Sequence, residues 1–520
     1  MNLSRFFSTI THMKPIQIYY RIHYFFRSKT GMTGETTNFT LPENISHLKL
    51  SGSIPQIQSY SDDGTFRFLN RETKFSSGID WNFSDHGKLW LYNLNYFDFL
   101  NQKEMSDNKG LELINDFINN YDNIKYGKDP YPSSLRTVNW IKFLSYRNIN
   151  DKKIDISLYA QYLRLINNLE YHLLGNHLLE NGFSLLAGAV YFRSDKIYET
   201  ACRILRKELE EQILPDGGHF ELSPMYHQTI LLRVLDSINI LKNNDFRKDE
   251  LLLLLIKKAS LMTGWLENMT FSNGEIPLFN DSSKEISPTT KELLFYAKNL
   301  EIITGNKTLK ESGYRKYKGE NYEMIVDAGN IGPDYIPGHG HADMFTFELN
   351  FKGNQVIVDT GTSTYEICER RNLERSTSAH NTVTIQNENQ SDVWAGFRVG
   401  KRAEIKITDE SENGIKASHN GYKRFGIIHE RSFECEKNRI VITDRLISEG
   451  SGIARFHFAP ETNPVLGKNT ILIDGIKFSF ENASKIKLVD FDYGCGFNFT
   501  KKSVCAEIEF DNDLNTVIEI

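Results

Sequence analysis

The spacing of apolar residues changes once along this chain of 520 residues, near residue 320, and that change restricts the fold more than any other feature. Before it, apolar residues recur every three or four positions, which predicts amphipathic helices. After it, they alternate with polar residues over short runs, which predicts strands half-buried on a sheet. The sequence therefore predicts a helical domain followed by an antiparallel β-domain.

The predicted helices are long and are separated by short breaks rich in Gly, Pro, Asn or Asp. Helices joined in this way pack as antiparallel hairpins. We expect them over residues 89–99, 112–121, 135–146, 156–174, 178–192, 194–213, 225–241 and 250–269. The short strands that follow have no helices between them, as is typical of an antiparallel sandwich.

The first 80 residues fit neither pattern. Residues 1–29 mix Arg and Lys with aromatic side chains, without the apolar core or cleavage site of a secretory signal. Such a segment either packs on its own domain or associates peripherally with a membrane. Residues 30–80 are polar and irregular. We therefore predict a wrapping segment over 1–80, a helical domain over 81–320 and a β-domain over 321–520.

Composition excludes several classes of protein. The formal net charge of -6 argues against a nucleic-acid partner, although a local basic cleft could still hold an acidic substrate. The longest apolar run, residues 251–256, is too short to form a transmembrane segment. Five scattered cysteines suggest unpaired thiols in a reducing compartment. We expect a cytoplasmic protein.

The stretch at residues 338–343 places His339, His341 and Asp343 next to two glycines, at the start of a predicted strand. In extended backbone, His339 and His341 would share one face. With Asp359 and His380 they supply nitrogen and oxygen donors that suit zinc. Turn positions beside glycines explain the same histidines without a metal, and their spacing leaves both interpretations open.

Several motifs, taken together and in this order, resemble those of the heparinase II/III family of polysaccharide lyases. They are Asn176-His177-Leu178-Leu179-Glu180-Asn181-Gly182, Gly217-Gly218-His219-Phe220-Glu221-Leu222-Ser223-Pro224-Met225-Tyr226, Gly338-His339-Gly340-His341-Ala342-Asp343, Val358-Asp359-Thr360-Gly361 and Ser378-Ala379-His380-Asn381-Thr382-Val383. Residues 90–98 and 131–140 are similar to that family's N-terminal domain. The resemblance implies an incomplete (α/α) toroid followed by an antiparallel β-sandwich, as in alginate-lyase-like proteins.

The resemblance also implies a reaction, the β-elimination of a polysaccharide containing uronic acid. The substrate carboxylate must be neutralised by preorganised donors, a role that the resemblance gives to Asn176 and His177. A base must reach C5 and an acid must reach the leaving oxygen on C4, and these positions match Tyr226 and His339. A heparin-like or heparan-sulfate-like substrate is the expectation, although no dense basic cluster requires a sulfated chain.

The resemblance further implies a structural divalent metal, expected to be zinc, held by His341, Asp359 and His380. Candidate substrate-binding residues, for which packing is the alternative role, are Arg136, Asn139, Trp140, Glu180 and Arg371.

Two other classes stay open. A glycoside hydrolase would need paired carboxylates, for which Glu180, Glu221 and Asp343 are candidates. A non-catalytic carbohydrate-binding protein linked to polysaccharide biosynthesis would keep the cleft without the reaction.

Overall fold

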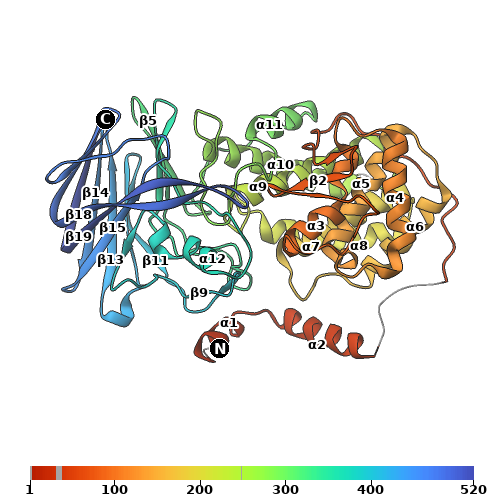
Figure 1. The fold of residues 1–520 in the computed structure, drawn as a ribbon, viewed down its shortest axis with the longest axis horizontal. Helices are drawn as coiled ribbons and strands as arrows, with labels where there is room; N and C mark the ends of the chain where they lie inside the picture. The colour runs from red at the N-terminus through yellow and green to blue at the C-terminus, as the bar shows by residue number, and fades with distance from the viewer. Residues whose placement is uncertain (1–2, 31–37, 248) are drawn as a thin grey trace.

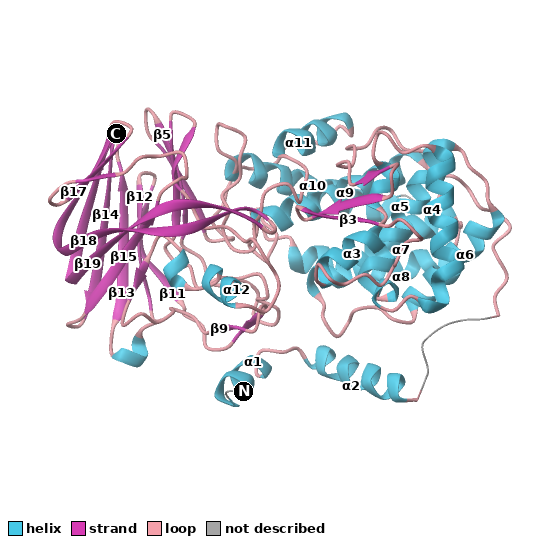
Figure 2. Cartoon of the chain, in the orientation of Figure 1, coloured by secondary structure: helices cyan, strands magenta, loops and turns pink. Residues whose placement is uncertain are grey.

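The computed structural model describes residues 3–30, 38–247 and 249–520 of the chain. Residues 1–2 and 31–37 of the predicted wrapping segment lie outside these ranges. Helices and strands separate into two halves, a helical domain and a β-domain that lie end to end (Figures 1 and 2). The predicted order of the two is confirmed: the last long helix ends at Asn299 and the first strand of the β-domain begins at Tyr314.

The helical domain is built from antiparallel neighbours around one apolar core. Its helices are α3 (Lys88–Tyr96), α4 (Asp107–Asn120), α5 (Pro130–Arg147), α6 (Lys152–Ile166), α7 (Gly175–Tyr191), α8 (Asp195–Gln212), α9 (Pro224–Asn243), α10 (Asp249–Met269) and α11 (Thr290–Asn299). Side chains of Ser106, Asp151, Ser194, Ser223 and Thr289 accept hydrogen bonds from first-turn backbone amides. Such caps explain why these helices start where they do.

Two parts of this half differ from the expected pattern. The segment expected to be irregular contains a small sheet, β1 (Tyr60–Ser61), β2 (Thr65–Phe68) and β3 (Arg71–Lys74). Phe66 and Phe68 of β2 are buried, and Phe68 packs edge to face on Trp90. Strands this short offer too few alternating positions for a period to be read. Helix α11 was not predicted either, because its ten residues show few apolar repeats.

The β-domain is built mainly from two antiparallel sheets. The smaller has the order β4 (Tyr314–Lys318), β5 (Tyr322–Asp327), β6 (Phe347–Phe351), β7 (Asn354–Ile357). The larger follows the path β11 (Ile405–Ser411), β12 (Gly414–His419), β13 (Ile428–Cys435), β14 (Arg439–Ile447), β19 (Phe499–Glu519), β18 (Ile476–Gly496), β17 (Thr470–Ile473), β16 (Val465–Leu466), with β15 (Ser451–His457) on β19 and β8 (Val383–Thr384) on β15. Phe347 of the smaller sheet meets Phe433 and Phe456 of the larger in the shared core.

The remaining elements described within residues 88–520 are short. They are the strands β9 (Val393–Trp394) and β10 (Arg398–Val399), the helix α12 (Glu369–Glu374), and the 3-10 turns Asp98–Asn101, Tyr121–Asn123, Tyr126–Lys128, Thr377–Ala379 and Lys423–Phe425.

Strands β18 and β19 form one long hairpin, whereas the sequence predicted separate short strands. Each has 21 residues, and their pairing shifts register near Glu481, Ala483 and Gly494. A register shift moves side chains to the other face and so breaks the alternation that the prediction relied on. The hairpin tip reaches the helical half, where Asn70 Nδ2 donates to Phe497 O at 3.1 Å and Asn498 Nδ2 donates to Leu69 O at 2.9 Å.

The N-terminal helices α1 (Leu3–Ile10) and α2 (Pro15–Lys29) run along one side of both domains, α1 beside the β-domain and α2 beside the helical domain (Figure 1). Among residues 3–30, 38–247 and 249–520, no helix is long and apolar enough to cross a membrane.

Candidate active site

Tyr226 and His339 lie together where the two domains meet. Tyr226 sits in the first turn of α9, whose N-terminus is fixed because Ser223 Oγ accepts from the Tyr226 amide at 3.2 Å. His339 lies in the loop between β5 and β6, not in the predicted strand, which begins only at Phe347. The two rings are tilted by 35° with centroids 4.0 Å apart. A phenol and an imidazole therefore face the same small volume.

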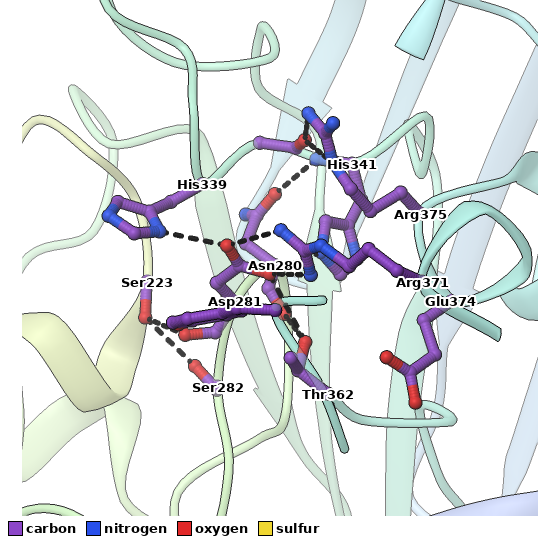
Figure 3. A network of polar contacts seen from close by, with 12 residues as sticks. Ser223, Asn280, Asp281, Ser282, His339, His341, Thr362, Arg371, Glu374 and Arg375 are labelled. Atoms are coloured by element: carbon purple, nitrogen blue, oxygen red, sulfur yellow. Dashed lines mark hydrogen bonds and ion pairs between the residues drawn. The ribbon is translucent and has the colours of Figure 1, made fainter. Parts of the chain in front are cut away.

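Asp281, which the sequence did not single out, contacts His339 at Nδ1 and fixes the position of its ring (Figure 3). Its carboxylate accepts from His339 Nδ1 at 2.8 Å, from His341 Nε2 at 2.9 Å and from both terminal nitrogens of Arg371. Burial favours the neutral acid, but Arg371 and the two histidines outweigh it and hold the pKa of Asp281 well below its usual range. The aspartate is therefore an anion inside the protein.

The charge on Asp281 fixes the tautomer of His339. An anionic carboxylate requires a proton on Nδ1, so the neutral ring carries its lone pair on Nε2. Nε2 lies on the side of Glu221, 3.6 Å from Oε2. The arrangement leaves His339 ready to accept a proton from a substrate at Nε2.

Asn176 is positioned by Glu221. Its backbone amide donates to Glu221 Oε1 at 3.2 Å and its side-chain Nδ2 donates to Oε2 at 3.1 Å. Helix α7 reaches this contact through Gly175, whose φ of +58° favours glycine and whose added Cβ would lie 2.9 Å from Glu221 Oε1. Burial raises the pKa of Glu221, against the opposing influence of His339. Asn176 therefore has a fixed orientation at the mouth of α7.

His177 follows Asn176 and pairs with another acid that the sequence reading missed. Its Nδ1 lies 3.0 Å from Glu170 Oε1, and Glu170 Oε2 accepts from Asn181 Nδ2 at 3.0 Å. Burial lowers the pKa of His177, but Glu170 more than compensates, so the net shift is upward. His177 also packs on the ring of Tyr131 at 4.7 Å. Glu170 thus favours the protonated form of the imidazole that stands next to Asn176.

Tyr365 joins the site from the β-domain and was also missed. Its hydroxyl lies 3.2 Å from the hydroxyl of Tyr226. Burial raises the pKa of both phenols well above 10. Tyr365 adds to the rise at Tyr226, whereas at Tyr365 the further rise comes from Asp281 and the hydrogen bond to Tyr226 opposes it. Both are therefore neutral phenols, able to donate a proton.

The missed residues left only weak signals in the sequence. Asp281 stands in the polar run at residues 280–283 after an apolar stretch, and Tyr365 stands in a Thr-rich loop. Nothing local ties either to His339, because the contact with Asp281 joins residues 58 positions apart.

Of the predicted substrate-binding residues, several are inside the protein. Arg136 and Trp140 are fully buried, and Arg136 donates to Gln161 Oε1 at 2.8 Å. Asn139 Nδ2 donates to Tyr96 O at 2.9 Å. For these three, packing is the role that their contacts fit, and substrate binding stays a prediction. Glu180 accepts from Arg233 Nε at 3.0 Å, and Arg371 is committed to Asp281.

The predicted metal ligands cluster beneath the site. His341 and His380 have ring centroids 5.3 Å apart, and His380 Nδ1 lies 2.7 Å from Asp359 Oδ2. Within the described ranges, no group of three or more His, Cys, Asp or Glu residues is arranged to hold a metal ion. Three buried atoms nevertheless lack a hydrogen-bond partner, His341 Nδ1, His380 Nε2 and Asp343 Oδ2. These donor types suit a divalent cation.

The helical toroid joined to an antiparallel β-domain is the fold of a group of solved polysaccharide lyases. The chain superposes on heparinase III with a TM-score of 0.63 and 18% identity, over 86% of this chain and 80% of that one. It matches the chondroitin AC lyase of Streptomyces coelicolor with a TM-score of 0.51 and 7% identity, over 82% of this chain and 74% of that one. At these identities the likeness shows the fold alone.

Sequence comparison gives the family. Residues 137–310 match the model described as heparinase II/III N-terminus, and residues 304–513 match the model described as heparinase II/III-like, C-terminal. The chain therefore belongs to the heparinase II/III family, as its motifs predicted.

The curated relatives are distant and longer. A heparin-sulfate lyase of Bacteroides stercoris is 25% identical over 358 residues, which is 62% of this chain and 51% of the relative. The heparin-sulfate lyase of Pedobacter heparinus is 25% identical over 326 residues, 56% of this chain and 48% of the relative. The matched region thus spans about half the length of these relatives.

Proposed function

We propose that this protein is a polysaccharide lyase that cleaves a chain containing uronic acid by β-elimination. The observation that carries the proposal is the close approach of the Tyr226 and His339 rings, whose centroids lie 4.0 Å apart, beside the Asn176–His177 pair. This set supplies a base, an acid and donors for a carboxylate within one site.

In the proposed reaction, His339 Nε2 takes the proton from C5 of the uronic acid. The electron pair of that C–H bond forms the C4–C5 double bond as the bond from C4 to the glycosidic oxygen breaks. The neutral phenol of Tyr226 donates its proton to that leaving oxygen. Asn176 and His177, whose protonated form Glu170 favours, bind the substrate carboxylate and stabilise the negative charge that develops on it.

A divalent metal, expected to be zinc, would be held by His341, Asp359 and His380. When bound it would cross-link three loops and would act structurally. The support is the pair of buried imidazole nitrogens without a partner, one on His341 and one on His380.

The substrate is proposed to be an acidic polysaccharide or oligosaccharide of the heparin or heparan-sulfate type. The support is that the curated relatives are named heparin-sulfate lyases. We also propose a cytoplasmic location, which is supported by the free thiols of Cys368, Cys435, Cys495 and Cys505.

A hydrolase is less well supported, because its candidate carboxylates are already engaged or enclosed. Glu180 pairs with Arg233, Glu221 accepts two hydrogen bonds from Asn176, and Asp343 is buried. A non-catalytic binding protein is not favoured by any particular contact.

The test is the ultraviolet absorbance of the unsaturated uronate during incubation with heparosan, heparan sulfate, hyaluronan, chondroitin and alginate. A rise with one polymer that is lost in His339→Ala and in Tyr226→Phe would support a lyase and identify its substrate. New reducing ends without a rise in absorbance would instead establish a hydrolase. Binding of a polymer without either product would establish a binding protein.

A further inference from the structure

Helix α2 contacts the protein mostly through polar and aromatic groups, apart from Ile16, which packs on the core, and it turns its other large apolar side chains to the outside. On the inner face, Gln17 Nε2 donates to Leu173 O at 3.0 Å, and the Tyr24 hydroxyl donates to Leu169 O at 2.5 Å. Tyr20 stacks on Tyr171 at 4.8 Å, and Arg27 donates to Asn167 O at 2.6 Å. A helix on the surface of a globular protein normally has the opposite polarity.

The outer face carries large apolar side chains in helical register. Their exposed fractions are 40% for Ile18, 62% for Tyr19, 53% for Ile22, 57% for Phe25 and 62% for Phe26. At about 100° per residue these positions fall within an arc of roughly 120°, opposite the inner face. Helix α2 therefore holds a continuous apolar stripe away from the protein that anchors it.

The charge of this segment also differs from that of the whole chain. Residues 3–30 contain five basic side chains, Arg5, Lys14, Arg21, Arg27 and Lys29, and no Asp or Glu, although the chain has a net charge of -6. Arg5 pairs with Asp392 and Lys14 with Glu211, which ties the segment to both domains. Arg21 is exposed beside the apolar stripe, and Lys29 is exposed at its C-terminal end. Basic groups that flank an apolar stripe complement a surface carrying negative charge.

We propose that α2 is an in-plane anchor for an anionic phospholipid membrane. The stripe would enter the boundary between headgroups and acyl chains, while Arg21 and Lys29 would contact the lipid phosphates. This membrane contact is independent of the proposed lyase chemistry, because none of these side chains belongs to the candidate active site.

A second copy of the chain fits the stripe less well. A helix of 15 residues is about 22 Å long, so its outer face covers roughly 200 Å². A stable protein interface needs about 800 Å² on each partner. A membrane surface requires no matching protein surface, and the aromatic and basic composition of the stripe is typical of interfacial helices.

The anchor would fix the orientation of the candidate active site relative to the membrane. Lys14, which directly precedes α2, lies 3.8 Å from the ring centroid of Tyr335, four residues before His339. The loop that carries His339 is therefore packed against the segment that would rest on lipid.

The experiment is co-sedimentation of the full chain with vesicles of phosphatidylglycerol and phosphatidylcholine, compared with vesicles of phosphatidylcholine alone. We expect binding to the anionic vesicles that weakens as salt is raised. Replacing both Phe25→Ser and Phe26→Ser should lower the partition coefficient by about tenfold or more. Replacing Arg21→Gln or Lys29→Gln should lower it by about fivefold each.

The matched control is the double variant Phe295→Ser and Ile303→Ser, whose side chains are 65% and 82% exposed on the helical domain. This control should bind vesicles as the unaltered chain does. Ultraviolet assay of a soluble oligosaccharide should be unchanged in all of these variants, so loss of vesicle binding is distinguishable from loss of the lyase reaction.

Three outcomes would overturn the proposal. They are no binding to anionic vesicles, equal binding by the Phe25/Phe26 variant and the unaltered chain, and a dimer in sedimentation velocity that the same variant converts to a monomer. The last outcome would identify the stripe as a contact between copies of this chain.

Discussion

The imidazole of His339 is oriented by Asp281, a residue of the opposite domain, through a 2.8 Å hydrogen bond to Nδ1. The proposed base and the group that sets its tautomer thus come from different halves of the molecule. His341 and Arg371, both in the β-domain, contact the same carboxylate. The candidate active site exists only when the two domains are docked.

The two neighbouring tyrosines should differ in importance. Tyr226→Phe removes the proposed proton donor, so we expect kcat to fall about a thousandfold with little change in KM. Tyr365→Phe removes only a hydroxyl 3.2 Å from that donor, and we expect a loss of about tenfold or less. Steady-state kinetics from ultraviolet absorbance measures both. An equal loss in the two variants would contradict the assignment of Tyr226 as the acid.

Asp281→Asn should damage stability and catalysis together. Arg371 would be left buried without its counter-charge, so we expect the free energy of unfolding to fall by about 3 kcal/mol. His339 would also lose the carboxylate that holds its proton on Nδ1, and activity of the folded fraction should fall by at least about a hundredfold.

Asp444→Asn is a matched control for Asp281→Asn. Asp444 is buried in the β-domain and accepts from both Arg431 and His429, much as Asp281 accepts from Arg371 and His339. The control should lose similar stability in urea titrations but should keep the activity of its folded fraction. If both variants keep activity, Asp281 has no role in orienting the base.

Glu221→Gln should weaken catalysis through Asn176. The two Asn176 nitrogens donate to different oxygens of Glu221, so in the same position the NH2 group of the glutamine would face one of these donors. We expect kcat/KM to fall by about tenfold or more while the fold persists. Glu180→Gln alters the Arg233 pair instead and should leave the Asn176 contacts unchanged. A larger kinetic effect from Glu180→Gln would contradict this role.

His227 should make the protein less stable below neutral pH. Its Nδ1 accepts from the His219 amide and its Nε2 donates to Met262 O, so only the neutral ring fits. Burial lowers the pKa of His227 from 6.5 to about 3. Above pH 6.5 its full contribution to stability is present. As pH falls from 6.5 toward 3 that contribution is lost, because His227 binds a proton in the unfolded chain but not in the folded one.

The measurement for His227 is urea unfolding at pH 7.5 and pH 5.5. The His227→Gln variant should lose roughly 1 kcal/mol less between these two values than the unaltered chain does. An identical pH dependence in both proteins would show that His227 takes up its proton equally in the folded and unfolded states.

Removal of a structural metal should lower the melting temperature. If zinc is bound, mass spectrometry of the purified protein should find about one equivalent, and a chelator should lower Tm by several degrees. His380→Ala should abolish both the zinc content and the response to the chelator, and His419→Ala, a buried histidine elsewhere in the β-domain, should abolish neither. Purified protein without metal whose Tm does not respond to added zinc would contradict the proposed site.

The sequence predicted the two-domain fold because the apolar period is a local property that each segment carries by itself. It failed where local evidence was interrupted, as in β18, whose pairing shifts register twice between Glu481 and Lys485. It also failed where strands were too short to show a period, as in β1–β3. Tertiary pairing, and not local preference, determines those segments.

The candidate site divides in the same way. Tyr226 and His339 stand in motifs that the sequence shows directly and that point to the family when taken together and in order. Asp281 and Tyr365 are found only when the fold brings residues 58 and 139 positions apart into contact. Arg136 and Trp140 show the reverse case, because residue type suggested sugar binding whereas helix packing encloses both side chains.

The long hairpin β18–β19 connects the β-domain to the helical half of the molecule. Its tip bonds to Leu69 and Asn70 on the helical side, while Gly494 N donates to Thr360 O on the β side at 2.7 Å. The hairpin and the N-terminal helices therefore link the two domains at places other than the chain segment between α11 and β4 (Figure 1). Contacts at several places oppose bending between the two domains, so we expect the proposed polymer substrate to reach Tyr226 and His339 without one domain closing on the other.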